Sequence, residues 1–276
     1  MKLPFFLFDI GASHTRVGFS FDGENIVNTE IYPTPENFEA GINLLEQKAK
    51  SLVANQKANA IVGGIAGHLN LERTMVAYAP NLPDWNNKPL AEELMKRTGA
   101  KVFLENDTAM VGLGEAVKGA GRVFKIVAYM TVSTGVNGVL IVDKKIAPNS
   151  FGFEIGKQII DFDSSYDKNA RNFEDLVAGS QFPRRHGKES YEITNVDVWE
   201  EEARLIAYGV NNMILFWSPD IVVLGGGVIK QVPIDKVREK VSETLTIFGK
   251  LPQIKIAEIA DFGGLFGALH YAKLLA

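Results

Sequence analysis

Two polar turns rich in glycine and hydroxyl residues are the first places where chemistry can be expected. Residues 9–15 follow an apolar run at the N-terminus, and residues 133–138 follow another in the middle of the chain. Such turns can direct several backbone N–H groups at phosphate oxygens. Asp9, at the expected end of a strand, could hold a hydrated Mg²⁺, which prefers carboxylate and water ligands. Either turn alone could also be an ordinary hairpin loop.

Two further segments carry candidate binding or catalytic groups. Residues 224–228 place three consecutive glycines after a buried type of apolar run, and glycines let a backbone approach adenine or ribose closely. A dinucleotide-binding fingerprint needs GxGxxG after the first strand and an acidic residue about twenty positions later, which excludes that reading. Glu105-Asn106-Asp107 lies where an expected strand meets an expected helix. Asp107 is therefore either part of a helix cap or a general base for an attacking hydroxyl.

The elements that would position these groups form two similar halves. Each turn joins two predicted strands and opens a run of alternating strands and helices, separated by an expected hinge at residues 119–121. This alternation predicts a mainly parallel sheet in each half, with a ligand cleft between the halves. Two candidate phosphate-binding turns in matching halves are stronger evidence for a phosphate-binding site than either turn alone. The predicted strands are 2–8, 15–21, 58–66, 101–104, 124–132, 138–143, 221–224 and 253–257, and the predicted helices are 34–52, 90–97, 108–118, 194–217, 234–248 and 265–275.

Composition excludes several classes of protein. A net charge of -4 offers no basic surface for nucleic acid or anionic lipid. The absence of cysteine excludes disulfides and cysteine-ligated metals. Residues 126–142 are the longest apolar stretch but contain polar interruptions, and residues 5–8 are too short for a signal peptide. We therefore expect a cytoplasmic protein without nucleic-acid or membrane partners.

In order along nearly the whole chain, five motifs resemble those of the ROK sugar kinases, a branch of the actin-like ATPase superfamily. The sequence departs from the family at Ala12 and His14, where Gly and Lys are usual, and at Asp84, Asn137 and Val139, where glycines are usual. The resemblance implies an α/β actin-like ATPase (ribonuclease H-like) fold with two α/β domains around a central cleft. The matching segments are residues 9–16 and 133–135 (phosphate motifs), 79–85 (sugar-side loop), 104–107 (catalytic motif) and 224–228 (adenosine motif).

The same resemblance implies an ATP- and Mg²⁺-dependent kinase that phosphorylates a hexose or N-acetylhexosamine, in a glucokinase-like way at the 6-hydroxyl. Asp107 would be the catalytic base, and Asp9 would also hold Mg²⁺ through water. The implied sugar contacts are Gly67, Asn81, Asn106, Glu154, Lys157 and Glu174. The implied nucleotide contacts are Asp9, Gly11, Ser13, His14, Thr15, Ser133, Thr134, Gly135, Gly225, Gly226 and Gly227.

The zinc site of the family is missing from this sequence. Lys157 stands where the family has a zinc-binding histidine that also contacts sugar, and every cysteine of the zinc cluster is absent. Residues 161–171, where that cluster would lie, show no metal-ligand spacing. We expect no zinc, and our hypothesis is that Lys157 has taken over the sugar-side role between Glu154 and Glu174. The alternative is a lysine that points to solvent.

Two charged clusters are interpreted as solvent-exposed surface. They are Arg184-Arg185-His186 and Glu200-Glu201-Glu202, the second at the start of a helix, where negative charge suits the helix dipole.

The expected domains are residues 1–118, with the C-terminal helix 262–276 packed back on them, and residues 119–261. A homodimer is a candidate assembly. The leading alternative function is a non-catalytic sugar-sensing or nucleotide-binding protein of the same fold, and a second is an actin-like ATPase acting in assembly or chaperoning. The sequence opens directly on the first strand, without the helix-turn-helix of family regulators, which disfavours DNA binding. Asp9 and Asp107 favour the kinase.

Overall fold

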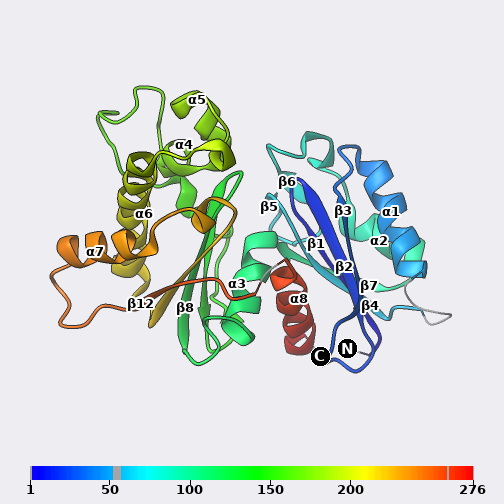
Figure 1. Ribbon diagram of the computed structural model, residues 1–276. Helices are drawn as coiled ribbons and strands as arrows, with labels where there is room; N and C mark the ends of the chain where they lie inside the picture. Colours follow the sequence, from blue (N-terminus) through cyan, green and yellow to red (C-terminus); the bar gives the residue numbers. More distant parts are fainter. Residues whose placement is uncertain (1, 52–56, 260, 276) are drawn as a thin grey trace. The chain divides into compact units, whose positions relative to one another are not determined.

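The computed structural model describes residues 2–51, 57–259 and 261–275, and the chain forms two compact units (Figure 1). Unit 1 contains Met1–Gly119, Pro148–Gly152 and Ile259–Ala276, and unit 2 contains Ala120–Ala147 and Phe153–Glu258.

Unit 1 is built on a five-stranded sheet of order β3-β2-β1-β4-β7. β1 pairs antiparallel with β2 and parallel with β4, and β4 pairs parallel with β7. Apolar side chains alternate between the faces, so that α1 and α2 pack on one face and α3 and α8 on the other (Figure 1). The elements are β1 (Phe5–Ile10), β2 (His14–Ser20), β3 (Val27–Pro33), α1 (Phe38–Ser51), β4 (Ala60–Ile65), a hairpin of β5 (His68–Leu69) and β6 (Val76–Tyr78), η1 (Pro83–Trp85), α2 (Leu90–Thr98), β7 (Lys101–Asn106), α3 (Asp107–Val117) and α8 (Gly263–Leu274).

Unit 2 repeats this strand pattern in a second sheet of order β10-β9-β8-β11-β12. β8 pairs antiparallel with β9 and parallel with β11, and β11 pairs parallel with β12. The repeated halves predicted from the sequence are thereby confirmed. The expectation of mainly parallel sheets was wrong, because two of the four strand pairings in each sheet are antiparallel. The elements are β8 (Ile126–Val132), β9 (Val136–Val142), β10 (Lys145–Ile146), η2 (Ile155–Lys157), α4 (Phe173–Val177), η3 (Gly179–Gln181), α5 (Phe182–His186), η4 (Ser190–Glu192), α6 (Val196–Trp217), β11 (Ile221–Gly225), η5 (Val228–Lys230), α7 (Ile234–Thr244) and β12 (Gln253–Ile256).

Helix α1 begins at Phe38, four residues after residue 34, where the predicted helix 34–52 starts. The capping groups are Asn37 and Asp84. Asn37 Oδ1 accepts a hydrogen bond from Ala40 N at 3.0 Å, and Asp84 Oδ2 accepts one from the backbone N of Phe38 at 2.9 Å. Asp84 therefore has a structural role at the position where the resembling family has glycine.

Helices α3 and α8 cross at backbone contact (Figure 1). A Cβ added at Gly267 would lie 1.8 Å from the carbonyl oxygen of Met110, and one added at Gly114 would lie 2.1 Å from that of Gly263. Backbone atoms cannot yield as a flexible side chain can, so the crossing requires glycine at both positions. The close contact fixes α3, whose first residue is Asp107.

Replacing Gly267 with alanine should lower the free energy of unfolding by about 3 kcal/mol, the upper part of the usual range for overpacked cores. The alanine must push α8 away from α3, since its methyl group meets backbone. Urea unfolding followed by circular dichroism would measure the loss. Gly249→Ala is the control, because nothing lies within 4 Å of its added Cβ, and its effect should stay within about 0.5 kcal/mol. Equal stability of the two variants would contradict the prediction.

Among the residues that the structure describes, we find no helix with the length and hydrophobicity of a transmembrane segment.

Candidate active site

The candidate residues fall into two groups, one in each unit, and each group is described by itself. In unit 1, residues 11–13 form the predicted turn between β1 and β2, with Gly11 N donating to the carbonyl oxygen of His14 at 3.0 Å. The backbone N–H of Gly11 is thus used within the turn. Ser13 and His14 are exposed, whereas Thr15 is buried.

Thr34 braces this turn from the end of β3. Its hydroxyl donates to the carbonyl oxygen of Gly11 at 2.7 Å and lies 2.9 Å from the Thr15 hydroxyl, while its backbone N donates to Ser13 O at 3.0 Å. Thr34, the first residue of the predicted helix 34–52, therefore lies outside α1 and stabilises the candidate phosphate turn.

Two carboxyl groups in unit 1 titrate far above their ordinary range. Burial, together with the nearby charge of Asp107, raises the pKa of Asp9 to about 7, although Arg16 lowers it. Burial also raises the pKa of Asp107 to about 6, although a hydrogen bond from Thr108 N lowers it. Carboxyl groups with pKa values near neutrality are candidates for proton transfer and cation binding.

The position of Asp107 follows from the strand-to-helix junction between β7 and α3. Asn106 caps α3, with its Oδ1 accepting from Ala109 N at 3.1 Å. A Cβ added at Gly64, on the neighbouring β4, would lie 2.8 Å from Asp107 Cα, so the strand backbone packs directly against the catalytic candidate. Asp107 is held by backbone contacts on rigid elements.

Asn106 and Gly67 lie together on the predicted sugar side. Asn106 Nδ2 donates to the carbonyl oxygen of Gly67 at 3.1 Å. Gly67 has a φ of +115°, and an added Cβ would come within 2.7 Å of Tyr78 O, so only glycine fits. The amide of Asn106 has a second hydrogen and its oxygen a second lone pair, which a ligand could use. Asn81 lies on an exposed turn of the loop that follows β6.

A partly buried network next to Asn106 was not predicted from the sequence. Glu105 is 5% exposed, is paired with Arg73, and accepts from the backbone N of Asn106 at 2.9 Å through Oε1. Arg73 also donates to Asn149 Oδ1 at 3.1 Å. Burial raises the pKa of Glu105, and the charge of Arg73 opposes that rise. This network supports the strand end that precedes Asp107.

In unit 2, residues 133–135 form the second predicted turn. Ser133 N donates to Gly135 O at 2.9 Å, closing the turn on itself. The start of η3 holds its outer side, since Gly179 N donates to Ser133 O at 2.6 Å and Ser180 N donates to Thr134 O at 3.2 Å.

Glu174, on α4, joins this turn to Lys157. Its Oε2 accepts from the backbone N of Val136 at 2.9 Å, and its Oε1 accepts from the ammonium group of Lys157. Partial burial lowers the pKa of Lys157, but Glu174, followed by Glu154 and Asp175, outweighs this effect, and the pKa is raised overall. Lys157 is therefore a charged partner of a glutamate, although half of its side chain is exposed.

A cavity of about 230 Å³ brings the second turn together with the glycine-rich segment. Gly225 is buried against the Tyr129 hydroxyl, and Gly226 has a φ of +99°. Of the three glycines, only Gly227 lines the cavity. Close packing explains the glycine at position 225, and the positive φ explains the one at position 226. Glu189 and Ser190 also line the cavity, although no sequence pattern marks them as functional. The lining residues are Ser133, Thr134, Gly179, Ser180, Glu189, Ser190, Gly227 and Val228.

Comparisons with known proteins give a consistent result. Residues 7–274 match the ROK family. The chain is 26% identical to a glucokinase of Thermotoga maritima over 99% of this chain and 98% of the relative. It is also 26% identical to an N-acetyl-D-glucosamine kinase of Mannheimia succiniciproducens, over 95% of this chain and 96% of the relative.

A solved structure shares the fold over almost the full length. The ROK family glucokinase of Streptomyces griseus, in complex with glucose and AMPPNP, has a TM-score of 0.83 and 23% identity, covering 99% of this chain and 100% of that chain. The expected actin-like ATPase fold is thereby confirmed.

Proposed function

Since the chain belongs to the ROK family, we propose that it is an ATP-dependent sugar kinase. Its acceptor is a hexose or N-acetylhexosamine, and the two full-length relatives are a glucokinase and an N-acetylglucosamine kinase. We propose the 6-hydroxyl as the phosphorylated group. The observation that carries the proposal is Asp107, a carboxyl with a pKa of about 6 on a rigid strand-to-helix junction.

Asp107 acts as the general base. With a pKa of about 6 it is mostly ionised near neutral pH and still basic enough to accept the proton of a sugar hydroxyl. Asn106, anchored by Gly67 O and by its capping bond, orients the sugar beside it. Phosphoryl transfer needs little covalent help from the protein, so positioning and charge neutralisation account for most of the catalysis.

The turn at residues 133–135 and the cavity beside it bind the nucleotide. The cavity joins hydroxyl groups of this turn to the exposed backbone at Gly227, which suits phosphate oxygens and a flat nucleoside. The turn at residues 11–15 supplies the second phosphate contact. We propose that catalysis is divided between residues 1–118 with the C-terminal helix 262–276, which carry the base, and residues 119–261, which carry the nucleotide cavity.

Mg²⁺ fits the surroundings of Asp9. Asp9 is 5% exposed and its carboxyl has a pKa of about 7 because of burial and of Asp107, so a cation beside it would favour ionisation. Asp9 would hold the ion through water, and the ion would neutralise charge on the transferred phosphoryl group.

The sugar-side wall in unit 2 is formed by Glu154, Lys157 and Glu174. Carboxylates accept hydrogen bonds from sugar hydroxyls, and an ammonium group donates to them. We propose that the Lys157–Glu174 ion pair orders this wall without zinc, which fits the absence of cysteine. Elemental analysis of untagged protein should find no stoichiometric zinc. We also propose a cytoplasmic location, where ATP is available and a protein needs no disulfides.

Lys157→Ala should raise the KM for the sugar roughly tenfold, about the effect of one lost charge-assisted hydrogen bond, and leave the KM for ATP within about twofold. The expected cause is that Glu174 loses its ammonium partner and is no longer held toward the ligand. Initial-rate kinetics with each substrate varied in turn would measure the split. Lys236→Ala is the control, because Lys236 pairs with Glu239 on α7 in the same unit. An unchanged sugar KM would show that Lys157 is a surface residue without a role in sugar binding.

A coupled ADP-release assay over a panel of hexoses and N-acetylhexosamines tests the function itself. Sugar-dependent ADP release, with the product identified by mass as a sugar monophosphate, would support the kinase. The rival is a non-catalytic sugar- or nucleotide-binding protein. Binding of a sugar or of ADP in calorimetry without turnover would favour that rival.

A further inference from the structure

Two charged clusters that the sequence placed on solvent-exposed surface are partners of each other. The Arg185 side chain is 8% exposed, and it donates through the same nitrogen to Glu202 Oε1 and to the carbonyl oxygen of Leu176. Glu202, on α6, is fully buried, and His186 Nε2 lies 3.7 Å from its Oε1. For Arg185 and Glu202 the expectation of a solvated surface was wrong, because each neutralises the other in the interior.

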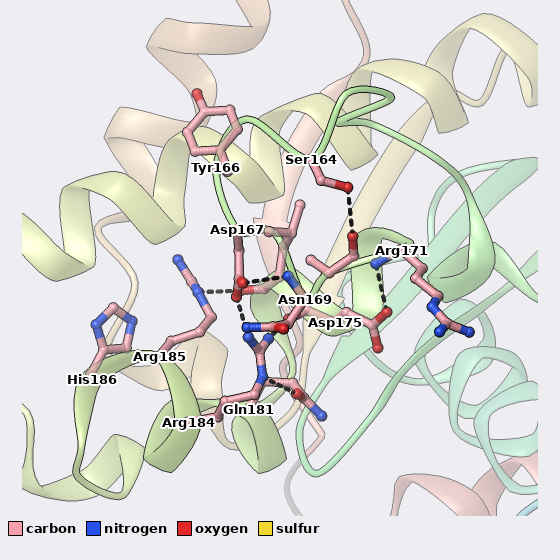
Figure 2. A network of polar contacts seen from close by, with 12 residues as sticks. Ser164, Tyr166, Asp167, Asn169, Arg171, Asp175, Gln181, Arg184, Arg185 and His186 are labelled. Atoms are coloured by element: carbon pink, nitrogen blue, oxygen red, sulfur yellow. Dashed lines mark hydrogen bonds and ion pairs between the residues drawn. The ribbon is translucent and has the colours of Figure 1, made fainter.

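Arg184, the preceding residue on α5, makes a similar contact with the backbone carbonyl group of Asp175, which precedes Leu176. It donates to Asp175 O at 2.8 Å, to Gln181 Oε1 at 3.1 Å, and to the carboxylate of Asp167 (Figure 2). Consecutive arginines of α5 therefore hold consecutive carbonyl groups, Asp175 O and Leu176 O, in the last turn of α4. Carbonyls at a helix end lack partners within the helix and sit at its negative pole, so cationic donors suit them.

Helix α4 has only five residues and could not hold its position alone. Its N-terminal end is capped by Asn172, whose Oδ1 accepts from Asp175 N at 3.1 Å, and its C-terminal end is held by the two arginines. Between these anchors lies Glu174, which reaches Val136 N and Lys157. The contacts thus run from the buried Glu202 through Arg185 and α4 to Glu174.

We propose that Arg184 and Arg185, fixed by Asp167 and Glu202, form a carbonyl clamp that positions Glu174 for sugar binding. The sugar role of Glu174 rests on the proposed function, whereas the clamp itself rests on contacts within unit 2. The arginines are positioning residues, since they act through α4. Because η3 holds the turn at residues 133–135 by its own backbone bonds, loss of the clamp should affect the sugar more than the nucleotide.

The test removes the buried pair as a whole. Arg185→Met alone would leave the buried Glu202 carboxylate without its counter-charge, and such a variant often fails to fold. The double variant R185M/E202M replaces both charges with apolar groups of similar length, a change that buried pairs commonly tolerate. The KM for the sugar should rise roughly tenfold, while kcat and the KM for ATP change by less than about threefold.

The matched control is Arg238→Met, which removes an arginine that also joins a carboxylate, Asp235, to a carbonyl, Ile254 O, in the same unit. It should leave all three kinetic constants unchanged. If the double variant does not fold, Arg184→Met serves instead, because that side chain is 34% exposed and its loss leaves no fully buried charge. A sugar KM within twofold of the parent in a folded clamp variant would overturn the proposal.

A second measurement separates the clamp from the proposed function. Exchange of the Val136 amide hydrogen, which bonds to Glu174, should be faster in the clamp variant than in the parent and the Arg238→Met control. If the parent phosphorylates no sugar, the proposed function fails, and faster exchange would still support the clamp. Unchanged exchange would overturn it whatever the activity.

Discussion

Replacing Asp107 with asparagine should lower kcat by roughly 10²–10⁴-fold, the usual contribution of a general base. Asparagine keeps the size and the hydrogen-bond acceptor of the side chain but cannot take a proton from the sugar hydroxyl. Sugar affinity, measured by calorimetry, should change little. Asp235→Asn is a control at an exposed carboxylate, and it should keep full activity.

The pH profile gives this prediction a second test. The pKa of Asp107 is raised to about 6, so the base is protonated and inactive below that pH. Because both carboxylates must be ionised in the proposed mechanism, the kcat/KM of the parent should begin to fall near pH 7, where the raised pKa of Asp9 lies. Below about pH 6, where Asp107 also takes up a proton, it should fall more steeply than tenfold per pH unit. In the Asp107→Asn variant, the pH dependence of the residual rate should lack the part of the acid limb that comes from protonation of Asp107. A near-normal kcat with an unchanged acid limb would refute the assignment.

The second large effect concerns Asp9, where stability and activity should change in opposite directions. Its pKa is raised from 3.8 to about 7, so the folded state binds the proton more tightly than the unfolded chain. The protein therefore loses stability as the pH rises from about 4 to about 7. A shift of this size corresponds to at most about 4 kcal/mol, and coupling to Asp107 reduces what a single change recovers.

Asp9→Asn should accordingly raise the free energy of unfolding by about 2 kcal/mol at about pH 8, and by less at about pH 5. The same change should lower kcat/KM for MgATP by roughly 10²-fold, since a charge that stabilises the transition state is removed. Urea unfolding at both pH values and initial rates would measure the two effects. A variant that is less stable than the parent at about pH 8 would contradict the stability prediction.

The succession of strands and helices along the chain and the two turns could be predicted because they depend on local patterns. Apolar runs alternate with polar turns, and the turns at residues 11–13 and 133–135 connect strands as expected. The start of α1 was misplaced because Asp84, far along the chain, supplies a cap that no local signal reveals. Similarly, α6 is capped by Asn195 and begins at Val196, two residues after the predicted start of this helix at residue 194.

The charged interior could not be predicted for a related reason. Glu202 lies in a run of three glutamates that looks like the polar start of a helix, and only the packing of α6 shows that its side chain points inward. The pairing with Arg185 spans seventeen positions, and that of Arg73 with Glu105 spans thirty-two. The ligand-binding roles of the site residues remain predictions, whereas the contacts of these residues within the protein are now described.

The covering of the first sheet by α8 has a consequence for how the chain is made. Phe5, Leu7 and Val62 pack against Leu265 and Leu269 of that helix. About 200 residues separate Val62 from Leu265, so a ribosome adding about 5–20 residues per second needs on the order of 10–40 s to supply the missing partner. During that time the nascent chain presents an uncovered apolar sheet face, which is a target for chaperones. Unit 2, complete at Glu258, can finish folding before unit 1, although synthesis begins with unit 1.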